Sequence, residues 1–280
     1  MNRMHRLSII TAVALALTAG VISPAQAAAP SNDGPGKART ATGIGYSDSV
    51  NVSQATSGRS EPSTCSNNAS VWYKFTSSST ETINVNTSGS NYDTVIGVYT
   101  GRPGSFTQVK CRNWGETRQA ALDLEVQAGR TYYFMVGACC GNGRDGRDFA
   151  RQPLLLQFNL MAPLRIEMAA LADTGTVSGT AEGDARLTLS TRCNHVAKGG
   201  WIEGTLQQRV GEIFIARGFT FRRPSCETSS TEVTLRFIPE GDVAFGEGPA
   251  TVWLHLVACS QETGTCTRRR LTREVVLALP

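Results

Sequence analysis

The sequence predicts an all-β protein built from two β-sandwich domains. From residue 44 to the end, short runs rich in Val, Ile, Thr, Tyr and Phe alternate with clusters of Gly, Ser, Asn and Asp. The runs recur at roughly 8–15-residue spacing, which is typical of sandwiches and barrels. Over the same stretch no segment shows the sustained 3.6-residue apolar period of an amphipathic helix. With 40% hydrophobic and 18% charged residues, the chain has the composition of globular domains rather than of disordered or fibrous proteins.

The first 27 residues have the pattern of a signal peptide for export. Arg3 and Arg6 give a basic start, residues 7–22 form an apolar run, and residues 25–27 read Ala-Gln-Ala. We therefore expect cleavage after Ala27 by the Sec route and a secreted protein. No later apolar stretch approaches the roughly 18 residues that a membrane span needs, so we expect no such span.

Residues 28–43 are small, polar and rich in Gly and Pro, so we expect a flexible leader. Further along, Pro163 cannot donate to a β-ladder and marks a boundary between domains at 44–162 and 163–280. The strands predicted in the first domain are 46–52, 71–76, 81–86, 94–99, 107–110, 120–126, 131–137 and 154–160. Those predicted in the second are 164–170, 175–180, 186–191, 201–208, 213–221, 232–237, 251–258 and 272–279.

Three ordered blocks give the first domain a family resemblance. They are the segment from SVWYKF to VIGVYTG, the segment VKCRNWG, and the segment LEVQAGRTYYFMVGA. Over residues 45–161 they resemble bacterial pre-peptidase C-terminal (PPC) domains. This resemblance implies a jelly-roll-like β-sandwich that accompanies secreted hydrolases, usually peptidases, without being catalytic. In the second domain, GTVSGTAEGDARLTLSTRC and VWLHLVACSQETGTC resemble immunoglobulin-like modules of exported actinobacterial proteins, which implies a sandwich and no activity.

An even number of cysteines in an exported chain predicts disulfides. The eight cysteines are Cys65, Cys111, Cys139, Cys140, Cys193, Cys226, Cys259 and Cys266. Neighbouring Cα atoms lie about 3.8 Å apart, whereas ordinary disulfides join Cα atoms roughly 4.4–6.8 Å apart. We therefore expect Cys139 and Cys140 to reach different partners. These partners are Cys65 and Cys111, in an order that the sequence leaves open.

In the second domain, Cys259 and Cys266 flank SQETGT, whose Thr-Gly step suits a hairpin tip. We expect these two to pair, which leaves Cys193 and Cys226 to each other. The rival is an inter-sheet bridge from Cys193 to Cys259. The spacing of the cysteines fits no zinc site, and we predict no metal and no cofactor.

Two loops of the first domain carry the candidate ligand-binding residues, Tyr92, Asp93 and Trp114. Loops concentrate binding residues, but both rings could also anchor their loops by packing. Asp93 could accept N–H bonds from its own turn. A calcium role for Asp93 is disfavoured because calcium takes six to eight oxygen ligands, and arginines interrupt the loop at 141–148.

The second domain carries a basic cluster at 268–270 and Arg273. On a strand these side chains alternate between faces, and such charges discourage edge-to-edge aggregation. The alternative is that they bind a polyanion. In the neighbouring predicted strand, His255 shares a face with Trp253, as a half-buried strand residue does.

The formal charge of +4 gives no strong attraction to nucleic acid or anionic membranes. Motifs of serine hydrolases, zinc peptidases and phosphate-binding loops are missing from the sequence. The sequence thus predicts a non-catalytic protein that binds an extracellular polysaccharide, a cell-wall polymer or a protein. Two alternatives stay open: an accessory or inhibitory partner of a separately encoded secreted peptidase, and a hydrolase that uses paired carboxylates.

Overall fold

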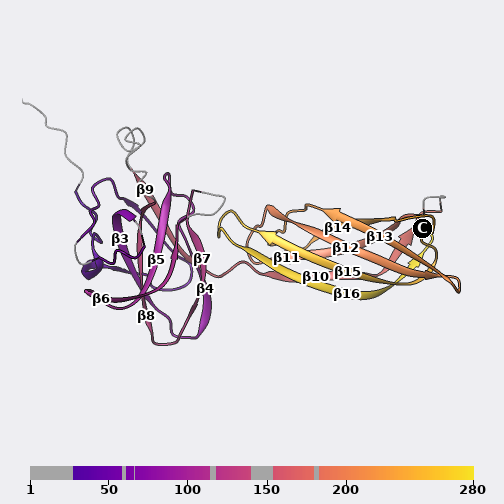
Figure 1. Cartoon of the computed structure of the whole chain (residues 1–280), viewed down its shortest axis with the longest axis horizontal. Helices are drawn as coiled ribbons and strands as arrows, with labels where there is room; N and C mark the ends of the chain where they lie inside the picture. Colours follow the sequence, from indigo (N-terminus) through magenta and orange to yellow (C-terminus); the bar gives the residue numbers. More distant parts are fainter. Residues whose placement is uncertain (1–27, 59–60, 66, 114–117, 140–153, 180–182) are drawn as a thin grey trace, which may run out of the picture.

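The computed structural model describes residues 28–58, 61–65, 67–113, 118–139, 154–179 and 183–280; the predicted signal peptide lies outside them. The all-β prediction is confirmed, because the described elements are strands apart from one short 3-10 turn, η1 (Pro35–Lys37). Strands β1 to β9 form a first unit and β10 to β16 a second, and the two lie end to end in Figure 1. Within the described residues, no helix has the length and apolar character needed to cross a membrane.

The first unit consists of two sheets packed face to face. One sheet has the order β1-β3-β8-β5-β6 and the other the order β2-β9-β4-β7. The strands are β1 (Arg39–Thr40), β2 (Tyr46–Asn51), β3 (Asn67–Thr76), β4 (Glu81–Asn86), β5 (Thr94–Arg102), β6 (Ser105–Arg112), β7 (Ala121–Val126), β8 (Thr131–Cys139) and β9 (Leu155–Met161). Pairing between these strands is antiparallel except between β1 and β3, which run parallel.

The core of the first unit lies between the two sheets. Along β9, buried residues alternate with more exposed ones, which is the pattern of a strand with one face on a core. Tyr73 on β3 and Phe158 on β9 stack across the core, with ring centroids 4.0 Å apart and planes inclined by 5°. Both side chains are fully buried, and burial of a Phe contributes about 1.5–3 kcal/mol. This stack therefore ties one sheet to the other.

The segment predicted to be a flexible leader, 28–43, is instead part of the first unit. The N–H of Trp72 donates to the carbonyl of Asn32 at 2.9 Å, and Asn32 Nδ2 donates back to the carbonyl of Trp72 at 3.1 Å. Ala38 packs against the cluster that contains Trp72, and β1 adds to the edge of β3. The segment is ordered because it covers the outer face of the five-stranded sheet, where the Trp72 indole is fully buried.

The second unit pairs β11 with β14 on one side and forms the four-stranded order β13-β12-β15-β16 on the other. This is the order that strands B–E and C′–C–F–G take in an immunoglobulin-type sandwich. The strands are β10 (Ile166–Val177), β11 (Ala185–Cys193), β12 (Gly199–Val210), β13 (Phe214–Arg222), β14 (Thr231–Pro239), β15 (Gly248–Cys259) and β16 (Cys266–Ala278).

The hydrogen bonding of the second unit closes on itself, which the prediction of a two-sheet sandwich does not include. The strands predicted at 164–170 and 175–180 are one strand, β10. It pairs antiparallel with β11 along its length, with a register shift between Leu171 and Gly175, and near its end it also pairs parallel with β16. A two-residue pairing of β13 with β14 closes the other side.

Both disulfides predicted for the second unit are confirmed. Cys193 bonds to Cys226, and Cys259 bonds to Cys266. The rival bridge from Cys193 to Cys259 is therefore wrong. Cys259 and Cys266 stand directly opposite each other at the end of the β15–β16 ladder, as residues flanking a hairpin tip do.

The pairing predicted for the first unit is wrong. Cys65 and Cys111 bond to each other rather than to the adjacent pair, and their Cα atoms lie 5.8 Å apart, an ordinary disulfide span. The bridge joins the loop that precedes β3 to β6, the edge strand of the five-stranded sheet. Cys139 is also disulfide-bonded, and Cys140 lies outside the described residues.

The hairpin between β15 and β16 contacts the first unit directly. At its tip the carbonyl of Gln261 accepts a hydrogen bond from Ser88 Oγ at 3.2 Å. Thr263 is fully buried. Gly264 lies so close to Ala121 that a Cβ added to it would be 2.4 Å from the Ala121 Cβ. The two units thus meet at a hairpin whose base is closed by a disulfide.

Candidate functional site

Tyr92, a candidate binding residue, is buried in the first unit. Its side chain is 7% exposed and belongs to the core between the sheets. Burial raises the pKa of the phenol, and its hydroxyl has no hydrogen-bond partner among the described residues. The ring is therefore a packed loop anchor, which is the alternative interpretation of the sequence, and offers no surface for stacking.

Asp93 is partly buried beside it. Burial raises the pKa of the Asp93 carboxyl, while the nearby Arg118 guanidinium acts in the opposite direction. The Asp93 carbonyl accepts the N–H of Cys139 at 3.0 Å, a contact that fixes the loop against β8. Trp114 and the loop at 141–148 lie outside the described residues. In the parts of the chain that the structure does describe, no group of three His, Cys, Asp or Glu side chains is placed to hold a metal.

A broader candidate surface lies on the outside of the sheet β13-β12-β15-β16. Residues opposite each other on antiparallel strands share a face, so the register defines rows across this sheet. We call the surface the aromatic face. Each row runs from β13 through β12 and β15 to β16. The first row is Phe221, Glu203, His255 and Arg270, the second is Phe219, Thr205, Trp253 and Thr272, and the third is Arg217, Gln207, Thr251 and Glu274. The face also includes Trp201, Arg223 and Arg268 at one end and Arg209 at the other.

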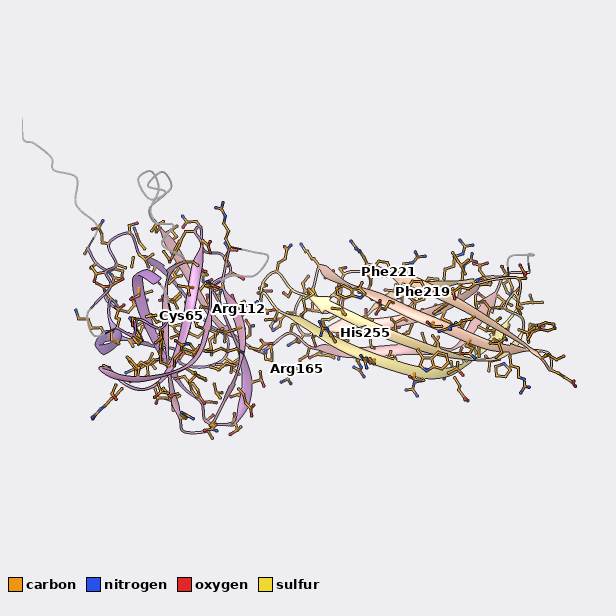
Figure 2. The ribbon with its side chains drawn as sticks, in the orientation of Figure 1. Cys65, Arg112, Arg165, Phe219, Phe221 and His255 are labelled. Atoms are coloured by element: carbon orange, nitrogen blue, oxygen red, sulfur yellow. A yellow bond between two sulfur atoms is a disulfide. The ribbon has the colours of Figure 1, made fainter. Side chains whose placement is uncertain are left out.

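Three aromatic rings of this face are accessible to solvent. Phe219 is 46% exposed, Phe221 43% and Trp253 41%. Phe219 and Phe221 are two residues apart on β13, about 7 Å along the strand, and Trp253 is two strands away from Phe219, about 10 Å across the sheet. Figure 2 shows both phenylalanines and His255 on the second unit. Exposed apolar side chains on one face make this face a candidate binding surface.

The side chains of β13 are small on the inside and large on the outside. Its inward positions are Ala216, Gly218 and Thr220, all buried. A Cβ added to Gly218 would lie 2.6 Å from the carbonyl oxygen of Ile238 and 2.8 Å from the ring of Phe245. The Ile238 backbone and the Phe245 ring thus leave no room for a large side chain on the inner side of β13, and strand alternation places Phe219 and Phe221 toward solvent.

Arginines surround the exposed rings. The aromatic face carries five arginines and two glutamates, so its net charge is +3 with His255 neutral. The guanidinium carbon of Arg223 lies 5.5 Å from the centroid of the Phe221 ring, within cation–π distance. The face can therefore offer apolar contact and positive charge to the same ligand.

The basic cluster of β16 divides between faces, as strand alternation predicts. Arg268 and Arg270 lie opposite Val257 and His255 on the aromatic face. Arg269 points to the other side, where Nη1 donates to the carbonyl of Ile166 at 3.2 Å.

His255 and Glu203 form a polar pair in the middle of the face. His255 Nδ1 lies 3.0 Å from Glu203 Oε1, and the imidazole donates because a carboxylate only accepts. The side chains are 27% and 43% exposed. The pair fixes the orientation of the imidazole next to Arg270, the residue across the ladder.

The hairpin between β12 and β13 carries a separate exposed apolar patch at its tip. Ile213 is 83% exposed and Phe214 60%. These side chains lie beyond the last paired row of the aromatic face, since Phe214 pairs with the final residue of β12, Val210.

The sequence places Trp253 and His255 on one strand face but does not identify the surface as a site. The available signal is the segment IARGFTF at 215–221, where small residues alternate with bulky or charged ones. Since Arg217 shares a side with Phe219 and Phe221, that side is the solvent side, and the two rings are exposed with it.

No family model and no curated protein matches the chain. Among solved structures, the chain is similar to the β-glucuronidase of Parabacteroides merdae, with 11% identity and a TM-score of 0.24 over 74% of this chain and 29% of that one. It is also similar to a β-glycosidase from Bacteroides vulgatus, with 12% identity and a TM-score of 0.25 over 72% of this chain and 25% of that one. The chain spans less than a third of the length of these enzymes, and similarity this low identifies neither a family nor an activity.

Proposed function

We propose that the protein is a secreted, non-catalytic binding module, that its ligand is an extracellular polymer, and that the aromatic face holds this ligand. The observation that carries the proposal is the gathering of Phe219, Phe221 and Trp253 on one sheet face, each 41–46% exposed. Aromatic rings bury a large apolar area on binding, and a sheet face offers them on a rigid support.

Export and an accessory role have independent support. The predicted signal peptide accords with the disulfides of the described residues, since disulfides persist in oxidising compartments. The resemblance of residues 45–161 to PPC domains favours a non-catalytic companion of secreted hydrolases. We assign binding to the second unit because Tyr92 and Trp72 of the first unit are buried.

The test is retention of the oxidised chain, without residues 1–27, on immobilised cellulose, chitin, polygalacturonate, cell-wall glycan and collagen. The test variant is Phe219→Ala/Trp253→Ala. The matched control is Ile213→Ala/Phe214→Ala, which removes two exposed apolar side chains from the hairpin tip instead. For the polymer that retains the wild type, we expect Kd to rise at least tenfold in the test variant, or about 1.4 kcal/mol. The control is expected to stay within twofold.

Two results would contradict the proposal. Equal retention of the test variant and the wild type would remove the aromatic face from the binding surface. If no polymer retains the wild type and a secreted peptidase co-purifies with it from culture medium, the peptidase-partner alternative replaces polymer binding. Release of soluble sugars or peptides during the assay would instead establish the hydrolase alternative.

A further inference from the structure

We infer that the polymer is an anionic polysaccharide whose sugars carry carboxylates, and that it lies across β13, β12 and β15 with sugar rings on the aromatic side chains and carboxylates on the arginines. This inference rests on the proposed function and narrows it to one class of ligand. It follows from the spacing of the rings, the charge of the face and the polar side chains between the rings.

The spacing of the rings favours a chain over a small molecule. Phe219 and Phe221 are separated along one strand, whereas Trp253 lies two strands away with Thr205 between. A ligand that covers all three rings must extend about 10 Å across the strands. Consecutive units of a polymer do this while each unit contacts one ring.

The charge of the face favours an anion. Arg217 lies beside Phe219 and Arg223 over Phe221, so a guanidinium accompanies each of the β13 rings. Arg270 lies across the ladder from His255, on the same side of the sheet as Trp253. A guanidinium pairs with a carboxylate through two parallel N–H donors, which gives direction as well as attraction.

The side chains between the rings favour a sugar. Thr205 separates Phe219 from Trp253, and Thr272 lies on the far side of Trp253. Gln207 and Thr251 stand in the next row. Hydroxyl and amide groups both donate and accept hydrogen bonds, as the hydroxyls of a sugar require.

The two acidic residues limit the charge density of the ligand. Glu203 and Glu274 lie among the arginines and reduce the net charge of the face to +3. A densely sulfated or phosphorylated chain would bring several charges close to these carboxylates, which repel them. One carboxylate per sugar matches the face better. Single-stranded nucleic acid also stacks on aromatic rings, and it enters the test as a competitor.

The experiment compares two polymers that share a backbone and differ in charge. The oxidised wild-type chain without residues 1–27 is titrated with polygalacturonate, with the same polymer after reduction of its carboxylates to alcohols, and with oligo-dT. We expect polygalacturonate to bind at least tenfold more tightly than the reduced polymer and more tightly than oligo-dT. The preference is expected to shrink as salt is raised, because the arginines are exposed and screened.

The variant Arg217→Gln/Arg270→Gln tests the assigned charges. Its matched control, Arg102→Gln/Arg112→Gln, removes the same charge from exposed positions on β5 and β6 of the first unit. We expect the test variant to lose at least tenfold in affinity for polygalacturonate and nothing for the reduced polymer. The control is expected to retain both affinities within twofold.

The outcomes separate this inference from the proposed function. Equal affinity for the charged and reduced polymers, or equal losses in the two arginine variants, would overturn the inference while polymer binding stands. Tighter binding to oligo-dT than to polygalacturonate would also overturn it. A third outcome is loss of polygalacturonate binding in Phe219→Ala/Trp253→Ala but not in Arg217→Gln/Arg270→Gln. It would support the aromatic face as the binding site and contradict the inference that its arginines bind carboxylates.

Discussion

Phenylalanines of the second unit differ widely in burial, depending on where each lies in the fold. Phe237 is fully buried in the core between the sheets, and Phe214, at the hairpin tip, is 60% exposed. The same type of side chain therefore stabilises the fold by packing in the core at position 237, whereas at position 214 it is mostly exposed to solvent. Such a matched pair allows the contribution of core packing to stability to be measured within one protein.

We predict that Phe237→Ala lowers the free energy of unfolding of the second unit by about 3–5 kcal/mol, because it leaves a cavity in a close-packed core. Phe214→Ala should change it by no more than about 0.5 kcal/mol. Urea unfolding followed by tryptophan fluorescence in a Trp72→Phe/Trp114→Phe background, which leaves Trp201 and Trp253 of the second unit as reporters, measures both. A loss of no more than about 0.5 kcal/mol in Phe237→Ala would contradict the packing assigned to its ring.

The roles of loop residues are the aspect of this protein that its sequence predicts least well. Tyr92 stands in a turn-rich segment and has the composition of an exposed binding loop, yet its ring is buried in the core. The N–H of Asn91, beside it, donates to the carbonyl of Leu155 at 3.2 Å, so the position of this turn depends on a segment far away in the chain. The aromatic face was not predicted, although IARGFTF carries a local signal for its solvent side, because the sequence does not show that β13, β12 and β15 lie side by side.

At the scale of elements, strand positions follow from local patterns and strand partners do not. The predicted strand 81–86 coincides with β4, because alternation and turn residues mark both of its ends. The parallel pairing of β1 with β3 has no local signal, since it depends on the outer sheet face that the segment covers. The second pairing of β10, with β16, likewise has no local signal, because β16 is the last strand of the chain.

Disulfides stabilise these elements more when they enclose a longer loop, although the effect grows only with the logarithm of the loop length. Cys193 and Cys226 are 33 residues apart and Cys259 and Cys266 seven. On the chain-entropy model, the long loop contributes about 4 kcal/mol and the short one about 2.5. We predict that Cys193→Ala/Cys226→Ala destabilises the second unit by about 1–2 kcal/mol more than Cys259→Ala/Cys266→Ala. Guanidinium unfolding of the oxidised variants measures the difference, and a larger loss from the short loop would contradict the entropic explanation.

At the scale of the whole molecule, the close contact between the units requires a residue without a side chain at position 264, which is Gly264. Gly264 and Gly211 both have positive φ, 63° and 66°, so alanine costs similar backbone strain at each. Only at Gly264 does the added Cβ meet the other unit, 2.4 Å from Ala121; at Gly211 nothing lies within 4 Å. The two positions therefore separate docking from local strain.

We predict that Gly264→Ala loosens the contact between the units, seen as faster tryptic cleavage after Arg165, the exposed residue at the junction that Figure 2 labels. Gly211→Ala should cleave at the wild-type rate. Adding Ala121→Gly to Gly264→Ala removes the clash and should restore much of the protection. Unchanged cleavage in Gly264→Ala would mean that the hairpin does not hold the units together.

The disulfide-closed hairpin between β15 and β16 also affects how the two units are oriented relative to each other. The aromatic face shares strands β15 and β16 with that hairpin, so a polymer bound there as proposed would lie in a defined orientation relative to the first unit for as long as the hairpin stays docked. If the first unit were attached to a surface, the orientation of the polymer on the second unit would then be fixed relative to that surface, and not only its distance from it.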